Sequence, residues 1–179
     1  MNTVEPIRNK SDIERMKKAL HGRNLLLFTI GINSALRISD ILALKVGDVR
    51  GKDTLMLKEQ KTGKTKQFRL NKSIQKAVRE LVPADAKDDD WLFPSRQGTK
   101  PISRVQAWRI LNEAAERAGV DVAIGTHTMR KTMAYHAYKS GTDISLLMRV
   151  LNHSSQRETL RYIGITQEQV DDVFESLDL

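Results

Sequence analysis

Residues 151–165, LNHSSQRETLRYIGI, contain one histidine and, nine positions later, one tyrosine. His153 and Tyr162 stand near predicted helix boundaries, where a lone histidine or tyrosine is ordinarily a packing residue. The other interpretation is that the Tyr162 hydroxyl is a nucleophile that attacks a phosphate. Taken alone, the stretch favours packing and does not decide between the two.

His127 and Arg130 form a second candidate site. They are three residues apart at the start of a predicted helix, so both side chains lie on one face. The free backbone amides and the dipole of a helix N-terminus favour a bound phosphate. The alternative, which this pair alone favours, is a polar cap and a surface arginine.

Two further cations stand at boundaries between predicted elements. Arg37 follows an apolar helix, so its side chain either reaches back to solvent or points into a cleft. Lys61 lies at the tip of a predicted hairpin whose other bases are Lys58, Lys64, Lys66 and Arg69. A solvated charged turn explains this cluster, but a basic hairpin tip also suits contacts with DNA phosphates.

The elements that must position these residues are mostly helical. The apolar run 24–33 predicts a buried central helix, and Ser11 to Glu14 has the pattern of a capping box before a short first helix. Strand-like runs at 54–58 and 66–70 predict a hairpin. Further helices are predicted to begin at the caps Ser39, Asn71, Thr126, Asp143 and Ser154 or Ser155, with others over residues 105–118 and in the tail. The predicted fold class is mainly α with a small antiparallel β-sheet (α+β), in a single domain over residues 1–179.

Composition excludes several classes of protein and site. The chain has no cysteine and no run of eighteen apolar residues, so disulfides, cysteine-ligated zinc and a membrane span are excluded. Its four histidines show no familiar ligand spacing, and neither a GxSxG motif nor a complete phosphate-binding loop occurs. We therefore expect no metal and no cofactor, and a cytoplasmic location.

The charge indicates a polyanionic partner. The chain has 30 lysines and arginines against 22 acidic residues, a net charge of +8, and a pI of about 9.8. This balance is typical of proteins that bind nucleic acid. The last fourteen residues, 166–179, reverse it with five acids and no base.

Four stretches together resemble the catalytic domain of the tyrosine recombinases, or phage-type integrases. They are ALRISDILALKVGDV (35–49), KTGKTKQFRL (61–70), GTHTMRKTMAYHAYKSGTDISLLMRVLNHSS (125–155) and TLRYIGI (159–165). The family signature is an arginine, a hairpin lysine, His-x-x-Arg, a second histidine or tryptophan, and the tyrosine nucleophile. Its matches here are Arg37, Lys61, His127, Arg130, His153 and Tyr162. Two positions depart from the pattern: Asn152 replaces the usual glycine before the second histidine, and Met129 replaces a common leucine.

The resemblance implies the tyrosine-recombinase catalytic-domain fold and a site-specific DNA recombinase or integrase that forms a 3′-phosphotyrosyl intermediate without a cofactor. The roles it implies are Tyr162 as nucleophile, His127 as its base, Arg37, Arg130 and His153 as donors to the phosphate oxygens, and Lys61 as the acid for the leaving 5′-oxygen. Asp40, three residues after Arg37, is expected to support that arginine or to cap locally. Alternatives are a catalytically weak DNA-binding regulator of the same fold and a type IB topoisomerase-like relaxing enzyme.

The resemblance also implies partners. We expect double-stranded DNA, a homo-oligomer that is a tetramer on DNA, and an accessory DNA-binding protein, since we also expect the family's N-terminal core-binding domain to be absent. Arg157 and Arg161 flank the tyrosine and either touch DNA phosphates or are solvated. The tail 163–179 is expected to dock in trans through Val170, Val173, Phe174 and Leu177, or else to pack within its own chain. The family points to a bacterial or phage-encoded protein that works on the nucleoid and has no membrane partner.

Overall fold

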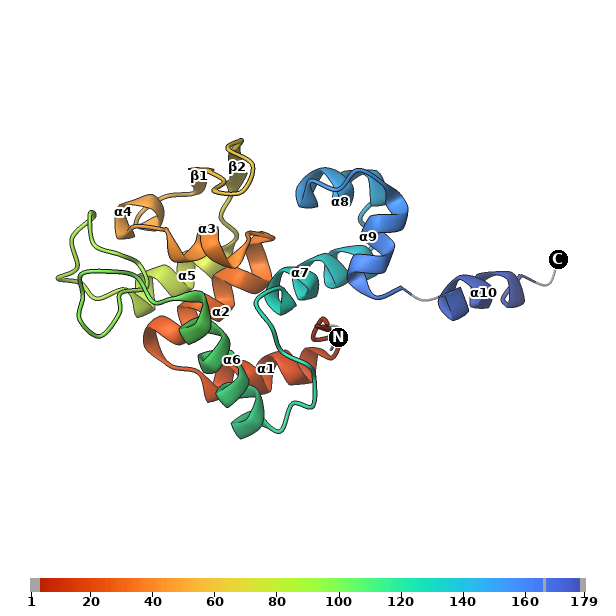
Figure 1. Ribbon diagram of the computed structural model, residues 1–179, viewed down its shortest axis with the longest axis horizontal. Coiled ribbons are helices and arrows are strands. Elements are labelled where there is room, and N and C mark those ends of the chain that lie inside the picture. The colour runs from red at the N-terminus through yellow and green to blue at the C-terminus, as the bar shows by residue number, and fades with distance from the viewer. Residues whose placement is uncertain (1–3, 166, 178–179) are drawn as a thin grey trace.

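The computed structural model describes residues 4–165 and 167–177, which form helices and one small sheet (Figure 1). In chain order the elements are α1 (Lys10–Ala19), α2 (Gly22–Ser34), α3 (Ile38–Leu42), α4 (Val46–Val49), β1 (Thr54–Lys58), β2 (Thr65–Arg69), α5 (Lys72–Leu81), α6 (Arg104–Ala118), α7 (Thr128–Lys139), α8 (Ile144–Leu151), α9 (Gln156–Ile163) and α10 (Gln167–Glu175). The predicted fold class, mainly α with a small antiparallel sheet, is confirmed.

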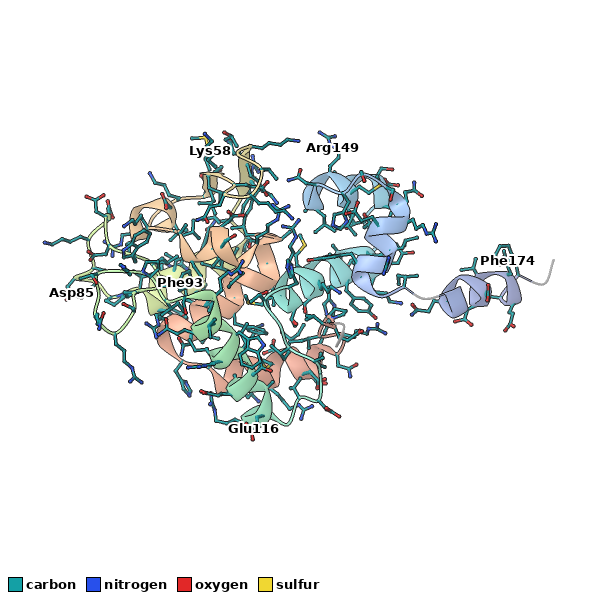
Figure 2. All side chains as sticks on the ribbon, viewed as in Figure 1. Lys58, Asp85, Phe93, Glu116, Arg149 and Phe174 are labelled. Atoms are coloured by element: carbon teal, nitrogen blue, oxygen red, sulfur yellow. The ribbon has the colours of Figure 1, made fainter. Side chains whose placement is uncertain are left out.

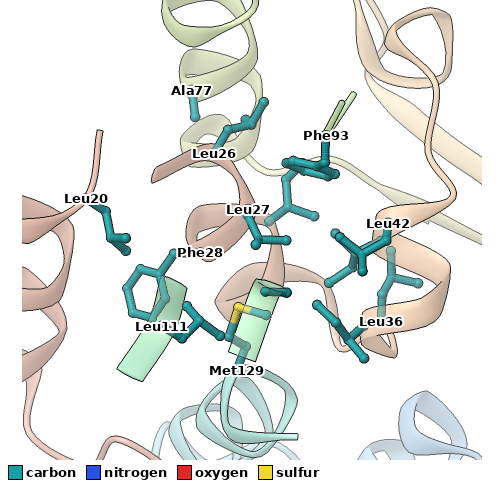
Figure 3. Close-up of a cluster of buried hydrophobic side chains, with 14 of the residues drawn as sticks. Leu20, Leu26, Leu27, Phe28, Leu36, Leu42, Ala77, Phe93, Leu111 and Met129 are labelled. Atoms are coloured by element: carbon teal, nitrogen blue, oxygen red, sulfur yellow. The ribbon is translucent and has the colours of Figure 1, made fainter. Parts of the chain in front are cut away.

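Helix α2 lies at the centre of the main core, as its apolar sequence predicts. Leu27 and Phe28 are fully buried, and side chains from α1, α3, α5, α6 and α7 surround them (Figure 3). Gly31 of α2 faces Met129 of α7, and a Cβ at this glycine would overlap the methionine side chain. Helix α7 therefore approaches α2 closely at the residue just before Arg130, and this contact ties the candidate site to the core.

Several helix starts follow the predicted caps. The side chain of Asn71 accepts from the amide of Ile74, that of Asp143 accepts from Ser145 and Leu146, and that of Ser155 accepts from Glu158. These are the short polar side chains that satisfy free amides at a helix N-terminus. The last of these bonds fixes the first turn of the helix that carries Tyr162.

Three predicted caps are wrong. Helix α1 begins one residue before Ser11, with Asn9 at the cap position, so Ser11 lies inside the helix. Ser39 likewise lies inside α3, whose cap position is Arg37. The cap position of α7 is His127 and not the predicted Thr126. The Thr128 hydroxyl accepts from the Gly125 amide, and this bond tightens the turn before the helix. In each case the observed cap position is one or two residues away from the polar residue that suggested it.

The two strands form an antiparallel hairpin, with Thr54 opposite Arg69 and Lys58 opposite Thr65. Beyond Lys58 the turn is closed by the Glu59 amide, which donates to Lys64, and by the Gly63 amide, which donates to Glu59. Gly63 has a positive φ of 66°, a conformation that glycine adopts without strain. Lys61 therefore stands in an exposed turn, while Glu59 at the base of the turn points inward and is buried.

Helices α7, α8 and α9 enclose a second, smaller cluster formed by Ala134, Leu147, Leu151 and Ile163 together with Ala35 from the end of α2. Tyr162 packs at the edge of this cluster. Helix α10 extends away from the rest of the chain (Figure 1), and its Val173 and Phe174 are exposed. No helix in the described part of the chain is long and apolar enough to cross a membrane.

Candidate active site

Arg37 is positioned by the sharp exit from α2. Ala35 adopts a left-handed conformation with φ of 51°, and Arg37 then occupies the cap position of α3. Its Nη1 lies 3.1 Å from Glu59 Oε1, and the glutamate side chain is only 1% exposed. Of the two open alternatives, a solvated arginine and one directed into the fold, the structure selects the second.

Arg130 lies in the first turn of α7 and is buried, with 4% of its surface exposed. Its Nη2 donates to the Leu151 carbonyl at 2.6 Å, at the end of α8. Its Nη1 is buried and has no hydrogen-bond partner among the described residues. A guanidinium held by one nitrogen, with another unpaired beside it, can receive a ligand oxygen.

His127 precedes Arg130 by one helical turn and remains exposed at the N-terminus of α7. Partial desolvation by its neighbours, followed by the positive charges of Arg130, Lys131 and Arg37, lowers its pKa below the ordinary value for histidine. The imidazole is therefore neutral at pH 7. A neutral histidine at this position can accept a proton.

His153 is oriented by a buried hydroxyl. Its Nδ1 lies 3.0 Å from Thr159 Oγ1, on the helix that carries Tyr162, and Thr159 is fully buried. The Thr159 hydroxyl has one proton for two acceptors, His153 Nδ1 and the Ser155 carbonyl at 3.3 Å. When it donates to Nδ1, the ring proton is on Nε2, the tautomer that a donor to phosphate requires. Burial and then the charges of Arg130 and Arg37 lower the pKa of His153, against an opposing effect of Glu158.

Tyr162 is a half-buried side chain whose hydroxyl has no hydrogen-bond partner among the described residues. Its ring meets that of His153 edge to face, and Lys131 Nζ lies 5.2 Å from the ring centroid. Burial raises the pKa of Tyr162 above that of free tyrosine, although the charges of Arg130 and Arg37 act in the opposite direction. The phenol is thus protonated and needs a base to become a nucleophile.

The two hairpin lysines have opposite placements. Lys61 is exposed in the turn and makes no hydrogen bond or ion pair with the other candidates among the described residues, though its charge contributes to the lowered pKa of His127. Lys66, predicted only as a DNA contact, is half-buried, and its Nζ donates to the Val150 carbonyl at 3.0 Å. Burial and then the charge of Arg130 lower the pKa of Lys66. The structure thus places Lys66 near Arg130, a proximity that the sequence did not suggest.

Two buried carboxylates lie among the cationic residues. The predicted supporting residue Asp40 is buried, and its Oδ1 accepts from the Gln60 amide at 2.9 Å, so it holds the hairpin rather than Arg37. Sequence reasoning missed Glu59, which holds Arg37. The available signal was a single acid within a hairpin that is otherwise rich in bases.

The remaining predicted DNA contacts are solvent-accessible. Lys58, Lys64, Arg69, Arg157 and Arg161 are all exposed. Lys58 of the hairpin and Arg149 of α8 project on the same side of the molecule in Figure 2. An open pocket of about 480 Å³ beside Tyr162 is lined by Lys131, Arg157 and Arg161, among others. Among residues 4–165 and 167–177, no three metal-ligating side chains gather at one place.

Comparisons of the sequence with known proteins point to one family. The family model described as the phage integrase family matches residues 7–169. The probable integrase/recombinase YoeC of Bacillus subtilis (strain 168) is 47% identical over 171 residues, which cover 94% of this chain and 93% of YoeC.

Solved structures show the same fold. XerA recombinase has a TM-score of 0.79 at 18% identity, covering 99% of this chain and 68% of that one. XerH site-specific recombinase, in a post-cleavage complex with a palindromic difH substrate, has a TM-score of 0.70 at 19% identity, covering 98% of this chain and 54% of that one. These two chains extend well beyond the part that matches. With the family model spanning most of its length, the chain belongs to the phage integrase family.

Proposed function

We propose that the protein is a site-specific DNA recombinase or integrase that cleaves and rejoins DNA through Tyr162. The observation that carries the proposal is that the Tyr162 hydroxyl and Arg130 Nη1 are both buried and unsatisfied by the rest of the described chain, with Arg130 facing the phenol and the Arg37 charge nearby. Buried polar groups are normally satisfied, and a site that leaves a hydroxyl and a guanidinium unpaired suits an anionic ligand. A DNA phosphodiester supplies that charge.

The proposed reaction is a transesterification. The Tyr162 oxygen attacks phosphorus, the P–O bond to the 5′-oxygen breaks, and a 3′-phosphotyrosyl link and a free 5′-hydroxyl result. The phenol proton passes to His127, which is neutral because its pKa is lowered. Lys61 donates a proton to the departing oxygen. A 5′-hydroxyl from another strand reverses these steps, so the energy of the bond is retained and no cofactor is required.

Arg37, Arg130 and His153 are proposed to stabilise the five-coordinate transition state. Negative charge grows on the non-bridging oxygens as the tyrosine attacks, and donors fixed beforehand stabilise that charge most effectively. Both arginines have one nitrogen held by the protein, Arg37 by Glu59 and Arg130 by the Leu151 carbonyl. The remaining donors of each fork are then oriented toward the phosphate without further reorganisation.

The exposed position of Lys61 fits a role that begins only on DNA. The lysine lies in a turn whose neighbours Lys58 and Lys64 are also exposed and basic. Contacts between this hairpin and the DNA backbone would bring the ammonium group to the leaving oxygen. The exposed Arg157 and Arg161 beside Tyr162 would bind phosphates on the other side of the cleavage point.

The proposed assembly is a tetramer on double-stranded DNA. The exposed Val173, Phe174 and Leu177 of the acidic C-terminal segment suit docking onto a neighbouring protomer, whereas the side chain of Val170 lies outside the described residues. An accessory DNA-binding protein is a further proposed partner. The proposed setting is the nucleoid of a bacterial cytoplasm.

A product assay separates this function from the two alternatives. Supercoiled plasmids carrying two copies of a site, selected from a randomised pool by binding to the protein, are incubated with the protein. A recombinase exchanges strands between the sites, a topoisomerase-like enzyme relaxes plasmids with or without a site, and a regulator binds the site without changing the DNA. Site-dependent exchange products support the proposal, and either of the other outcomes contradicts it.

A further inference from the structure

Glu59 is a buried carboxylate with three side-chain donors from three parts of the chain. Its Oε1 accepts from Arg37 at 3.1 Å, and its Oε2 accepts from Thr62 at 2.7 Å and from Asn152 at 3.0 Å. Burial alone would raise the pKa of Glu59, but the hydrogen bond from Thr62 and the charges of Arg37 and Lys66 lower it. The side chain is therefore an ionised acceptor in a region that must also receive a phosphate.

Asn152 provides the long-range link in this group. It ends α8 in the left-handed conformation, with φ of 55° and ψ of 44°. Glycine adopts this conformation most easily, and asparagine is among the few other residues that tolerate it. A glycine would satisfy the backbone but would leave Glu59 Oε2 without its donor from this segment. The side-chain amide is thus what asparagine adds at this position.

The segment around Asn152 carries two further bonds to the candidate site. The Val150 carbonyl accepts from Lys66, and the Leu151 carbonyl accepts from Arg130. Three consecutive residues at the end of α8 are therefore held by the hairpin, by α7 and by Glu59. His153 follows immediately, so its place relative to Arg37 depends on how this segment sits against the hairpin.

We propose that Glu59 and Asn152 form a positioning pair that locks the hairpin to the end of α8, and thereby sets His153 and Lys61 relative to Arg37. Neither residue is assigned a contact with the DNA. The inference rests on the proposed function for its catalytic readout, but the pair itself can be tested in the free protein. It also gives a physical role to Asn152, one of the two positions where the chain departs from the family pattern.

The first test uses Asn152→Gly, which keeps the backbone conformation and removes the donor. The measured quantity is the single-turnover rate of covalent adduct formation on nicked duplex DNA at saturating concentration, together with the Kd for that DNA. We expect the rate to fall about tenfold or more, because small misplacements of catalytic groups are costly, with the Kd and the thermal midpoint nearly unchanged. The matched control is Gln67→Ala, an exposed change on β2 next to Lys66 that should leave the rate unaltered.

The second test uses Asn152→Asp, which has nearly the same shape but places a carboxylate against Glu59. Arg37, Lys66 and Thr62 face Glu59, with Asp40 and Arg130 as the next charged groups around Lys66. Two adjacent carboxylates share a proton as the pH falls, and the protonated one can donate as the asparagine does. The ratio of the Asn152→Asp rate to the wild-type rate is therefore expected to rise as the pH is lowered from about 7 toward the ordinary carboxyl range of about 4 to 5.

Rates of both variants within about twofold of wild type would overturn the pairing, as would a pH-independent ratio or a loss explained entirely by a weaker Kd. Amide exchange of Glu59 and Gly63, whose bonds close the hairpin turn, provides a readout without DNA. Exchange at these amides is expected to be about threefold faster or more in Asn152→Gly. If the wild type forms no adduct, the proposed function fails, and unchanged exchange would separately overturn the positioning pair.

Discussion

The ring of His153 meets the ring of Tyr162 edge to face, with their centroids 5.0 Å apart. The contact arises because Ser155 caps α9 and Thr159, one turn later, binds the His153 ring. The two side chains, which are nine residues apart in the sequence, are therefore in contact. The proposed donor to phosphate and the proposed nucleophile are thus held by the same short helix.

Arg130→Lys should reduce the single-turnover rate of adduct formation by about 10²–10³-fold at saturating DNA. A lysine cannot both donate to the Leu151 carbonyl and present a planar fork to a phosphate. The matched control is Arg79→Lys, an exposed change of the same kind on α5 that should leave this rate within a few-fold of wild type. A fully active Arg130→Lys variant would contradict the assignment of Arg130 as a transition-state donor.

The pH dependence of cleavage at subsaturating DNA should report the free protein's His127. Its pKa is lowered, so the base is neutral at pH 7 and becomes protonated only below the ordinary histidine value of about 6.5. The rate should therefore be high at neutral pH and fall as the pH drops through this lowered pKa. His127→Gln should lower the rate and remove most of this acidic limb, while His21→Gln, an exposed change at the start of α2, should retain it. An unchanged limb in His127→Gln would mean that another group is the base.

Lys61→Ala should slow cleavage by about 10²-fold or more on ordinary DNA. On a substrate with sulfur in place of the leaving 5′-oxygen, the loss should shrink to a few-fold, because a thiolate leaves without a proton. The control Lys64→Ala, exposed in the same turn, should show no such difference between the two substrates. If Lys66→Ala shows the rescue and Lys61→Ala does not, the general acid is Lys66 and the assignment of Lys61 is wrong.

Deleting residues 166–179 should weaken DNA-dependent oligomerisation, measured by light scattering on bound duplex DNA, and leave the thermal midpoint of the free protein nearly unchanged. Phe174 is 73% exposed in the free chain, so its removal uncovers little of the core. Replacing Val173, Phe174 and Leu177 with serine should have the same effect, whereas Asp172→Asn should have less. Unchanged assembly would remove the docking proposal, and a marked drop in the midpoint would favour packing within the chain.

Patterns of neighbouring residues predicted most of the fold. The apolar run around Phe28 identified the central helix, and the two strand-like runs identified the hairpin, because both signals are local. The caps at Ser11, Ser39 and Thr126 were misplaced, since backbone turns decide a helix start to within a residue or two. The family signature marked the six candidate residues, but nothing local showed which of them would be buried.

Contacts between distant segments could not be read from the chain. Glu59 and Asn152 are 93 residues apart, and no periodicity relates them. The inward position of Lys66 depends on the pleat of β2 and on where α8 ends, whereas the sequence shows only one of several hairpin lysines. Such placements come from tertiary packing, which sets the side-chain environment independently of local pattern.

The most direct measurement is covalent capture of DNA by Tyr162. Nicked duplexes from a randomised pool let the short strand with the 5′-hydroxyl dissociate, so that a phosphotyrosyl adduct accumulates and is detected by gel shift under denaturing conditions. Tyr162→Phe removes a buried hydroxyl that the described part of the chain leaves largely unsatisfied, so this variant should fold about as stably as wild type. The account predicts a 3′-linked adduct with the wild type and none with folded Tyr162→Phe. An adduct that persists in Tyr162→Phe, or a wild type that binds the pool and never becomes linked to it, would contradict the account.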